Sequence, residues 1–397
     1  MLALLGVLLF TAALLFSVMV HEFGHYIFAK RFGMKVTEFF LGFGQRIWST
    51  VRGETEFGIK AIPAGGYCRI EGMTIHDPLP AGEEHRAFVT ASTPRKLIVL
   101  GAGSFNHFVL GFIMIFLMIF GVGQQSLSNQ IGQIVPCVSS IDKCAASDPA
   151  SPSLKAGLKA GDKIIAINGV KTSNNNFSKD LAAVRKGSGK TFTFTIDRAG
   201  QVLQIPVTPV DRTIQGYTYS YVGMILKKAT YRESPIAAIK DSGTTTWFMI
   251  KESVKSLIKL PSMIPSLVRE TFGSEKRDPN GPVGIVGVAR ASGEITSNNS
   301  LGTSSQISVF LMMVASLNIF VGIFNLLPLL PLDGGHMAIA IADAIRYRYA
   351  ALRKRPKPAP IDINRLTPIT IAVFAVLVGL SVLLLIADIV NPVSLNI

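Results

Sequence analysis

Residues 20–25 read Val20-His21-Glu22-Phe23-Gly24-His25, and this H-E-x-x-H pattern follows directly on a run of apolar residues. Positions four apart lie on one face of a helix, so His21 and His25 can hold one metal ion together. Glu22 then lies beside the ion, where its carboxylate can take a proton from water. The pattern predicts a zinc site with a general base, and the competing interpretation is a chance occurrence of the pattern on an ordinary helix.

The residues before the motif favour a zinc site over a chance occurrence of the pattern. Leu2 to Val20 are 19 uncharged and mostly aliphatic residues, about the length that crosses ~30 Å of hydrocarbon. Ionisable side chains are costly at that depth and mark functional sites there, and a divalent cation offsets the cost. The run lacks a basic segment at its start, and cleavage near its end would discard the motif. We therefore interpret it as a retained membrane helix and not as a signal peptide.

The bulk composition also indicates a membrane protein. Of the 397 residues, 49% are hydrophobic and only 16% are charged, which excludes an ordinary soluble enzyme. The formal net charge is +14, yet no basic motif interleaved with aromatic residues points to nucleic acid as a partner. We expect the positive charge to reflect membrane topology and an anionic bilayer surface.

Uncharged runs of sufficient length predict an α-helical polytopic membrane protein with four transmembrane helices. Ten basic residues lie between Lys30 and Lys96 and seven between Arg346 and Arg365, so both loops belong in the cytoplasm. The long middle segment has no Lys or Arg next to its spans, so it is placed outside a plasma membrane, together with both termini. The predicted spans are Leu2–Val20, Leu97–Gly123, Ile307–Leu332 and Ile369–Ala387.

A membrane-associated β-hairpin is predicted soon after the first span. Between Glu54 and Met73, apolar and polar residues alternate on either side of Pro63-Ala64-Gly65-Gly66, as expected for two short strands around a turn. Such a hairpin can offer an unpaired edge to an extended peptide; a hairpin that packs only on its own loop is the alternative. The candidate substrate-binding residues on this edge are Gly65, Gly66, Tyr67, Cys68, Arg69 and Ile70.

Residues 132–209 have the composition of a small globular domain. The run from Ala156-Gly157-Leu158 to Asn168-Gly169 predicts a short helix, a Gly-Asp turn, a strand and an Asn-Gly hairpin turn. A helix at Ser178–Arg185 and strands near Thr191–Ile196 and Val202–Val207 are expected to follow. The arrangement resembles a PDZ domain, an α+β fold whose groove takes a peptide by strand addition.

Two further features lie outside the predicted spans. Cys137 and Cys144 are seven residues apart in one polar loop, where they form a disulfide in an oxidising exterior or remain as two free thiols. Pro235–Leu260 predicts a basic amphipathic helix, which either lies on the bilayer or packs on the PDZ-like domain. Its basic stripe consists of Lys251, Lys255 and Lys259.

A catalytic zinc takes three protein ligands plus water, and H-E-x-x-H supplies two. The third predicted span leads into Asn325-Leu326-Leu327-Pro328-Leu329-Leu330-Pro331-Leu332-Asp333-Gly334-Gly335-His336, in which two prolines break the helix at membrane depth. Asp333 is the preferred third ligand and His336 is its rival. His107, in the second span, is interpreted as structural, because a lone histidine in a membrane helix more often bonds to a neighbouring helix.

These motifs together resemble the site-2 protease family of intramembrane zinc peptidases, in its bacterial regulator-of-sigma-factor branch. The resemblance rests on H-E-F-G-H, on the Asn325, Pro328 and Asp333-Gly334 pattern, and on the PDZ-like insert between the second and third spans. The single insert and its cysteines are most similar to actinobacterial members. The resemblance implies one Zn²⁺ per chain, held by His21, His25 and Asp333, with Glu22 as general base. It also implies that Asn325 clamps the substrate and that Glu54–Met73 re-enters the membrane.

An endopeptidase that cuts single-span membrane proteins is the function that this resemblance implies. Anti-sigma factors already cut outside the cell by another protease are the expected substrates, with the PDZ-like domain selecting trimmed ends. A metal transporter and a catalytically silent scaffold are the alternatives. A transporter usually carries ionisable residues across several spans, and a silent homologue would lack Glu22 or a ligand. The predicted parts are residues 1–123 and 307–397 for the membrane core, 132–209 for the PDZ-like domain and 210–306 for a linker.

Overall fold

The computed structural model describes residues 2–73, 77, 81–139, 144–172, 177–214, 217–298 and 301–393. Two compact units are present: one combines Met1–Gly121 with Ser234–Ile397, and the other is Val122–Glu233.

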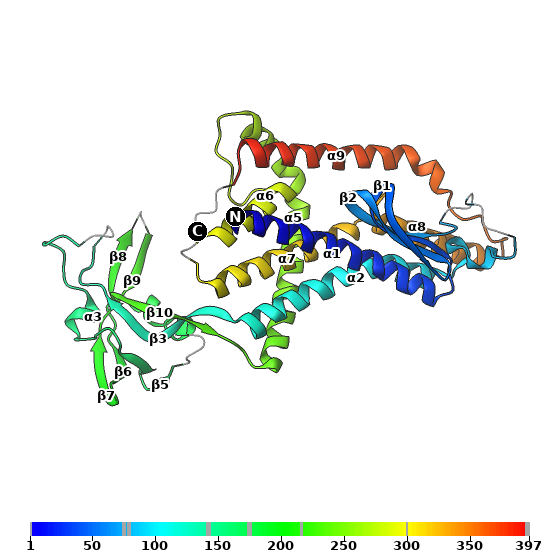
Figure 1. The fold of residues 1–397 in the computed structure, drawn as a ribbon. Coiled ribbons are helices and arrows are strands. Elements are labelled where there is room, and N and C mark those ends of the chain that lie inside the picture. The colour runs from blue at the N-terminus through cyan, green and yellow to red at the C-terminus, as the bar shows by residue number, and fades with distance from the viewer. Residues whose placement is uncertain are drawn as a thin grey trace. The chain divides into compact units, whose positions relative to one another are not determined.

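The first unit contains four helices that are long and apolar enough to cross a membrane. In Figure 1, the first two of them run side by side. The first continues past the predicted end at Val20 and carries the H-E-x-x-H motif within its uninterrupted length. The four are α1 (Leu2–Arg31), α2 (Thr93–Phe116, continued as a π-helix over Leu117–Val122), α7 (Thr303–Asn325) and α9 (Thr367–Val390).

The third of these helices ends earlier than the predicted span Ile307–Leu332. Helix α7 stops at Asn325, and residues 326–332 form an irregular loop because Pro328 and Pro331 cannot continue the helical hydrogen bonding. A helix that was not predicted from the sequence, α8 (Asp333–Leu352), follows this loop.

Two more α-helices belong to the first unit. Helix α5 (Pro235–Phe272) contains the predicted amphipathic segment and packs on α2 and α7 through an apolar cluster that includes Ala238, Ile119 and Ile319. The basic stripe at Lys251, Lys255 and Lys259 is exposed. Helix α6 (Ile285–Ser297) lies along α1, and a Cβ atom at Gly293 would lie 2.8 Å from the Ala3 carbonyl oxygen, so only a glycine permits this approach.

The predicted hairpin has a different topology from the one expected. Strands β1 (Val36–Arg52) and β2 (Thr55–Ile70) are joined by a turn at Gly53-Glu54. The predicted turn at Pro63–Gly66 lies inside β2, and the chain does reverse there, because residues 56–59 and 66–69 run in opposite directions along residues 38–41 of β1. Phe39 of β1 is paired with both Phe57 and Cys68. The two predicted short strands therefore do not pair with each other, because a segment of β1 lies between them.

This pairing makes one stretch of β2 an edge. Residues 66–69 are in register with residues 41 to 38 of β1, and no second strand pairs with them among the described residues. The outer side of this stretch thus presents backbone groups that no strand satisfies.

The second unit is built on an antiparallel sheet in the order β10-β3-β4-β6-β7. Its core includes Phe177, Phe194, Ile164 and Ile196, all fully buried. The strands of this sheet are β3 (Gln124–Ile134), β4 (Lys163–Ile167), β6 (Phe192–Arg198), β7 (Gln201–Val207) and β10 (Met224–Tyr231). The smaller elements are α3 (Pro152–Lys155), β5 (Val170–Lys171), α4 (Phe177–Asp180) and the separate hairpin of β8 (Val210–Ile214) with β9 (Tyr217–Tyr221).

Several local features of this unit were predicted from the sequence. Asn168 and Gly169 have φ angles of 51° and 80° in the turn between β4 and β5, so the predicted Asn-Gly turn is confirmed. Cys137 and Cys144 form a disulfide, which decides between the two interpretations above. The predicted helix Ser178–Arg185 is shorter, because α4 ends at Asp180 and a 3₁₀ turn follows at Val184–Lys186. The unit extends beyond the predicted residues 132–209 at both ends.

Candidate metal centre

Helix α1 presents His21 and His25 on one face, as their spacing requires. Both imidazoles are buried, and their Nε2 atoms lie 3.0 Å apart. Two neutral imidazoles whose lone pairs converge in this way are the usual start of a divalent-metal site.

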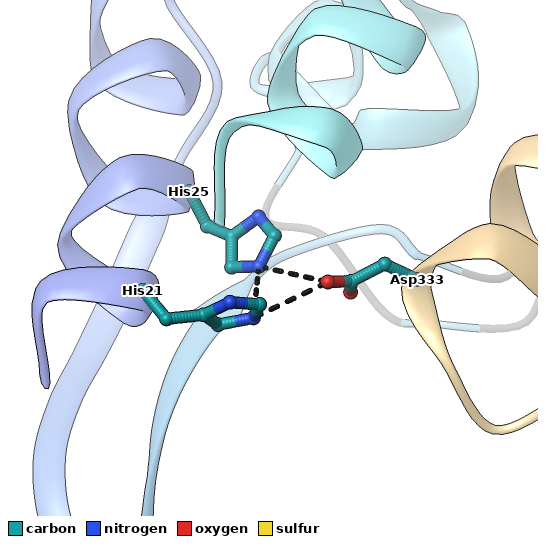
Figure 2. A group of neighbouring side chains, drawn as sticks. All are labelled: His21, His25 and Asp333. Carbon is teal, nitrogen blue, oxygen red and sulfur yellow. Dashed lines mark hydrogen bonds and ion pairs between the residues drawn. The ribbon is translucent and has the colours of Figure 1, made fainter. Parts of the chain in front are cut away.

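The carboxylate of Asp333 meets these two rings from the start of α8 (Figure 2). Two glycines make this position possible. A Cβ at Gly334 would lie 2.3 Å from the carbonyl oxygens of Leu326 and Leu327, and one at Gly335 would lie 2.6 Å from the Leu330 nitrogen. The loop 326–332 therefore lies directly against the first turn of α8 and fixes where Asp333 points.

The three donor atoms have the spacing that one small cation requires. Asp333 Oδ2 is 3.2 Å from His21 Nε2 and 3.4 Å from His25 Nε2. A tetrahedral zinc ion with bonds of about 2.0–2.1 Å separates its ligand atoms by about 3.3 Å. Asp333 Oδ2 is buried and has no hydrogen-bond partner in the part of the chain that the structure describes, so a bound cation would satisfy it. Among the described residues, these three form the group of side chains that can share a metal ion.

Helix α2 contacts both histidine rings and holds them in position. The Nδ1 atom of His25 lies 2.7 Å from the Val99 carbonyl oxygen, so Nδ1 carries the proton and Nε2 is left for a metal. A Cβ at Gly103 would lie 2.4 Å from Cε1 of His21, and hence only a glycine lets α2 approach this ring. Asn106 donates to the Val20 carbonyl oxygen at 2.7 Å and joins the two helices.

Glu22 lies next to the edge of β2. The backbone N–H of Cys68 lies close to the Glu22 carboxylate. A Cβ at Gly66 would lie 3.4 Å from Cγ of Glu22, so the strand and the carboxylate are in contact. The unpaired edge at residues 66–69 is thus directed at the predicted general base.

The other candidate residues of this edge have different surroundings. Tyr67 donates a hydrogen bond to Glu38, and Arg69 forms an ion pair with the same carboxylate. Both side chains therefore bind to strand β1, on which Glu38 lies. Ile70 is buried in an apolar cluster. Gly65 has a φ of 153°, and a Cβ there would lie 3.2 Å from the Phe43 ring.

The structure also places the residues considered as alternatives. Asn325 is the half-buried last residue of α7, joined to Asp333 by the loop 326–332. His336 lies one turn into α8 and lines a cavity of about 40 Å³ with Lys96 and Asp343, outside the group that can share a metal ion. His107 also lies outside that group, although its ring centroid is 5.0 Å from that of His21.

Sequence reasoning did not identify the supporting contacts of the site. The Val99 carbonyl that orients His25 is a backbone group, which any residue type would provide, so no sequence pattern signals it. Gly103 carries a weak signal, because a glycine in a membrane helix often marks a close helix contact.

Comparison with known proteins identifies related chains. The family model described as peptidase family M50 matches residues 9–358. The zinc metalloprotease Rip1 of Mycolicibacterium smegmatis is 35% identical, and that of Mycobacterium tuberculosis 33%, each over 98% of both chains. The probable protease eep of Enterococcus faecalis is 26% identical over 83% of this chain and 88% of its own.

Proposed function

The chain belongs to peptidase family M50, the site-2 protease family, and from this premise we propose that His21, His25 and Asp333 hold its catalytic zinc and that Glu22 is its general base. Membership makes the protein a zinc metalloprotease, and its four apolar helices fit a polytopic membrane protein. The observation that supports the ligand assignment is the convergence of three donor atoms within 3.0–3.4 Å of one another.

The proposed chemistry is hydrolysis of a peptide bond without a covalent intermediate. Bound zinc supplies Lewis acidity that polarises the scissile carbonyl and acidifies water. Glu22 takes one proton from the attacking water and delivers it to the leaving amine nitrogen, so the carboxylate is regenerated. The carboxylate lies next to the strand edge, close to the Cys68 N–H and the Gly66 backbone.

The proposed substrate is a single-span membrane protein whose transmembrane helix unwinds locally. A helix hides its peptide bonds in internal hydrogen bonds, so an extended segment must find new backbone partners. The edge at residues 66–69 offers such partners next to Glu22, and the side-chain amide of Asn325 is proposed to hold the substrate from the end of α7. In this reading β1 and β2 form the membrane-reentrant element.

The distribution of basic residues supports a proposed membrane topology. We place both termini and the PDZ-like unit outside the plasma membrane and the metal centre near its cytoplasmic side, on the basis of the Lys and Arg distribution. The proposed substrates are anti-sigma factors already trimmed by another protease. The PDZ-like unit is proposed to exclude untrimmed substrates or to bind their new ends.

The experiment that tests the chemistry compares variants of the purified full-length protein on a model membrane substrate. Glu22→Gln is expected to abolish cleavage while zinc content stays at the native level. The matched control is Glu252→Gln, because Glu252 lies on α5 in an exposed ion pair with Lys255. Undiminished cleavage by Glu22→Gln would contradict the base assignment. A zinc-loaded native protein that cleaves no substrate would favour a silent scaffold, and zinc flux into vesicles would favour a transporter.

A further inference from the structure

Behind the metal centre, three helices contribute to one buried polar cluster. Ser17 of α1, His107 of α2 and Asn318 of α7 are exposed by only 3%, 3% and 1%. His107 Nδ1 lies 2.8 Å from Asn318 Oδ1, and Asn318 Nδ2 donates to Ser17 Oγ at 3.1 Å. Polar side chains inside a membrane protein are costly to bury, and they therefore mark functional sites.

The hydrogen bonds of this cluster determine the tautomer of His107. Ser17 Oγ donates to the Ala13 carbonyl oxygen at 2.8 Å, so it must accept from Asn318. The Asn318 amide nitrogen also donates to the Val314 carbonyl oxygen at 2.8 Å, which assigns its nitrogen and oxygen. Asn318 Oδ1 therefore accepts, and the proton of neutral His107 is on Nδ1. The Nε2 atom of His107 is left as a hydrogen-bond acceptor.

His21 presents the complementary group. Its Nε2 faces His25 and Asp333, so a neutral His21 that binds metal through Nε2 keeps its proton on Nδ1. That Nδ1 atom is buried and has no hydrogen-bond partner among the described residues. The second ring nitrogen of a metal-bound histidine almost always has an outer partner. The ring of His107 is 5.0 Å from the ring of His21, centroid to centroid, with an angle of 42° between the planes.

We propose that His107 is a positioning residue for the zinc ligand His21. Its Nε2 accepts the hydrogen bond of His21 Nδ1–H, either through a small rotation of the rings or through one bridging water. Asn318 and Ser17 hold His107 in the tautomer that this bond requires. The inference rests on the proposed assignment of His21 as a ligand, and it gives His107 a role beyond helix packing.

The proposal predicts that substituting His107 weakens zinc binding, although His107 is not itself a ligand. Loss of the outer partner of a metal-bound histidine typically costs 10–100-fold in metal affinity or activity. Leucine at position 107 removes both the acceptor and the bond to Asn318. Glutamine can donate to Asn318 with its amide nitrogen and accept with its oxygen, so it is expected to rescue most of the affinity.

The test measures the zinc Kd of the full-length protein by chelator competition and the absorption spectrum after Co²⁺ substitution. His107→Leu is expected to weaken zinc binding 10–100-fold and to change the cobalt spectrum, with His107→Gln close to native. The control on the same helix is Phe105→Leu, because Phe105 is 61% exposed. A His107→Leu protein with native zinc Kd and native cobalt spectrum would overturn the proposal.

Two further measurements test the role of His107 independently of the zinc Kd. Thermal unfolding with and without zinc distinguishes a structural role, which would lower both midpoints equally, from the proposed role, which reduces the stabilisation by zinc. ¹⁵N-histidine NMR of the native zinc protein, which has six histidines, applies even if His107→Leu does not fold; an Nε2–H tautomer of His107 would overturn the proposal. If His21→Ala keeps its zinc, the ligand assignment itself is wrong.

Discussion

The Nε2 atom of His21 lies 3.2 Å from the Oδ2 atom of Asp333, although these residues are near opposite ends of the chain. Helix α1 provides one and the first turn of α8 provides the other. The contact between them depends on the loop that ends α7, on the glycines after Asp333 and on the close approach of α2.

Asp333→Asn is expected to lose zinc and activity together, because a neutral amide replaces the only anionic ligand of the proposed set. Zinc content by atomic absorption is expected to fall from about one per chain toward zero. The matched variant is His336→Ala, which removes the rival ligand and is expected to keep its zinc. The opposite result, with zinc kept by Asp333→Asn and lost by His336→Ala, would reverse the choice of ligand.

Gly334→Ala is expected to disturb the site without touching a ligand. The added Cβ would lie 2.3 Å from two carbonyl oxygens of the loop, which are backbone atoms that cannot move independently. Forcing atoms into a packed region typically costs about 1–3 kcal/mol, so both thermal stability and zinc affinity should fall. Gly379→Ala on α9 is the control, because a Cβ added there would have no atom of the described residues within 4 Å. Equal behaviour of the two variants would argue against the role of the loop contact.

Asp388→Asn is expected to destabilise the membrane unit. Asp388 and Arg277 are both exposed by only 1% in their side chains, and they pair at 3.5 Å between the end of α9 and the segment that connects α5 to α6. Removing one member of a buried ion pair typically costs about 3–5 kcal/mol. Because Arg277 also pairs with Glu270 at 3.8 Å, we expect a loss toward the lower end of this range. The control is Glu294→Gln in the exposed pair with Arg290, where the cost should be about 0–1 kcal/mol. Unfolding in detergent by denaturant or heat measures both.

Glu54 is expected to make stability depend on pH. Hydrogen bonds from Arg86 and Lys30 lower its pKa from 4.5 to about 2. Because the pKa of the folded state is the lower one, the stabilisation is present above about pH 4.5 and is lost as the pH falls toward 2. Glu54→Gln should therefore be less stable than native protein at pH 6, and the difference should shrink by pH 3. A difference that stays constant between these pH values would show that the ion pairs contribute nothing.

Features encoded in short stretches could be predicted from the sequence. His21, Glu22 and His25 depend only on the helical repeat, and the four spans depend only on the length of apolar runs. The Asn168-Gly169 turn follows from backbone preferences of two residues. Asp333 could be proposed as a ligand because it is a carboxylate directly after the third uncharged span and before two glycines, although its contact with the histidines was an inference from pattern and not from local geometry.

Features that depend on partners distant in the chain were decided only by the tertiary structure. The reversal around Pro63–Gly66 was predicted, but the pairing of its two flanking strands with each other was wrong. The alternation of residues defines strands but not their partners, and β1 supplies the pairing for both segments. The same holds for the Val99 carbonyl behind His25 and for the contact of His107 with His21. The sequence alone determined which residues can do chemistry and how they repeat along each helix. The packing of helices and strands decided which of them meet, since that depends on close approach between segments far apart in sequence.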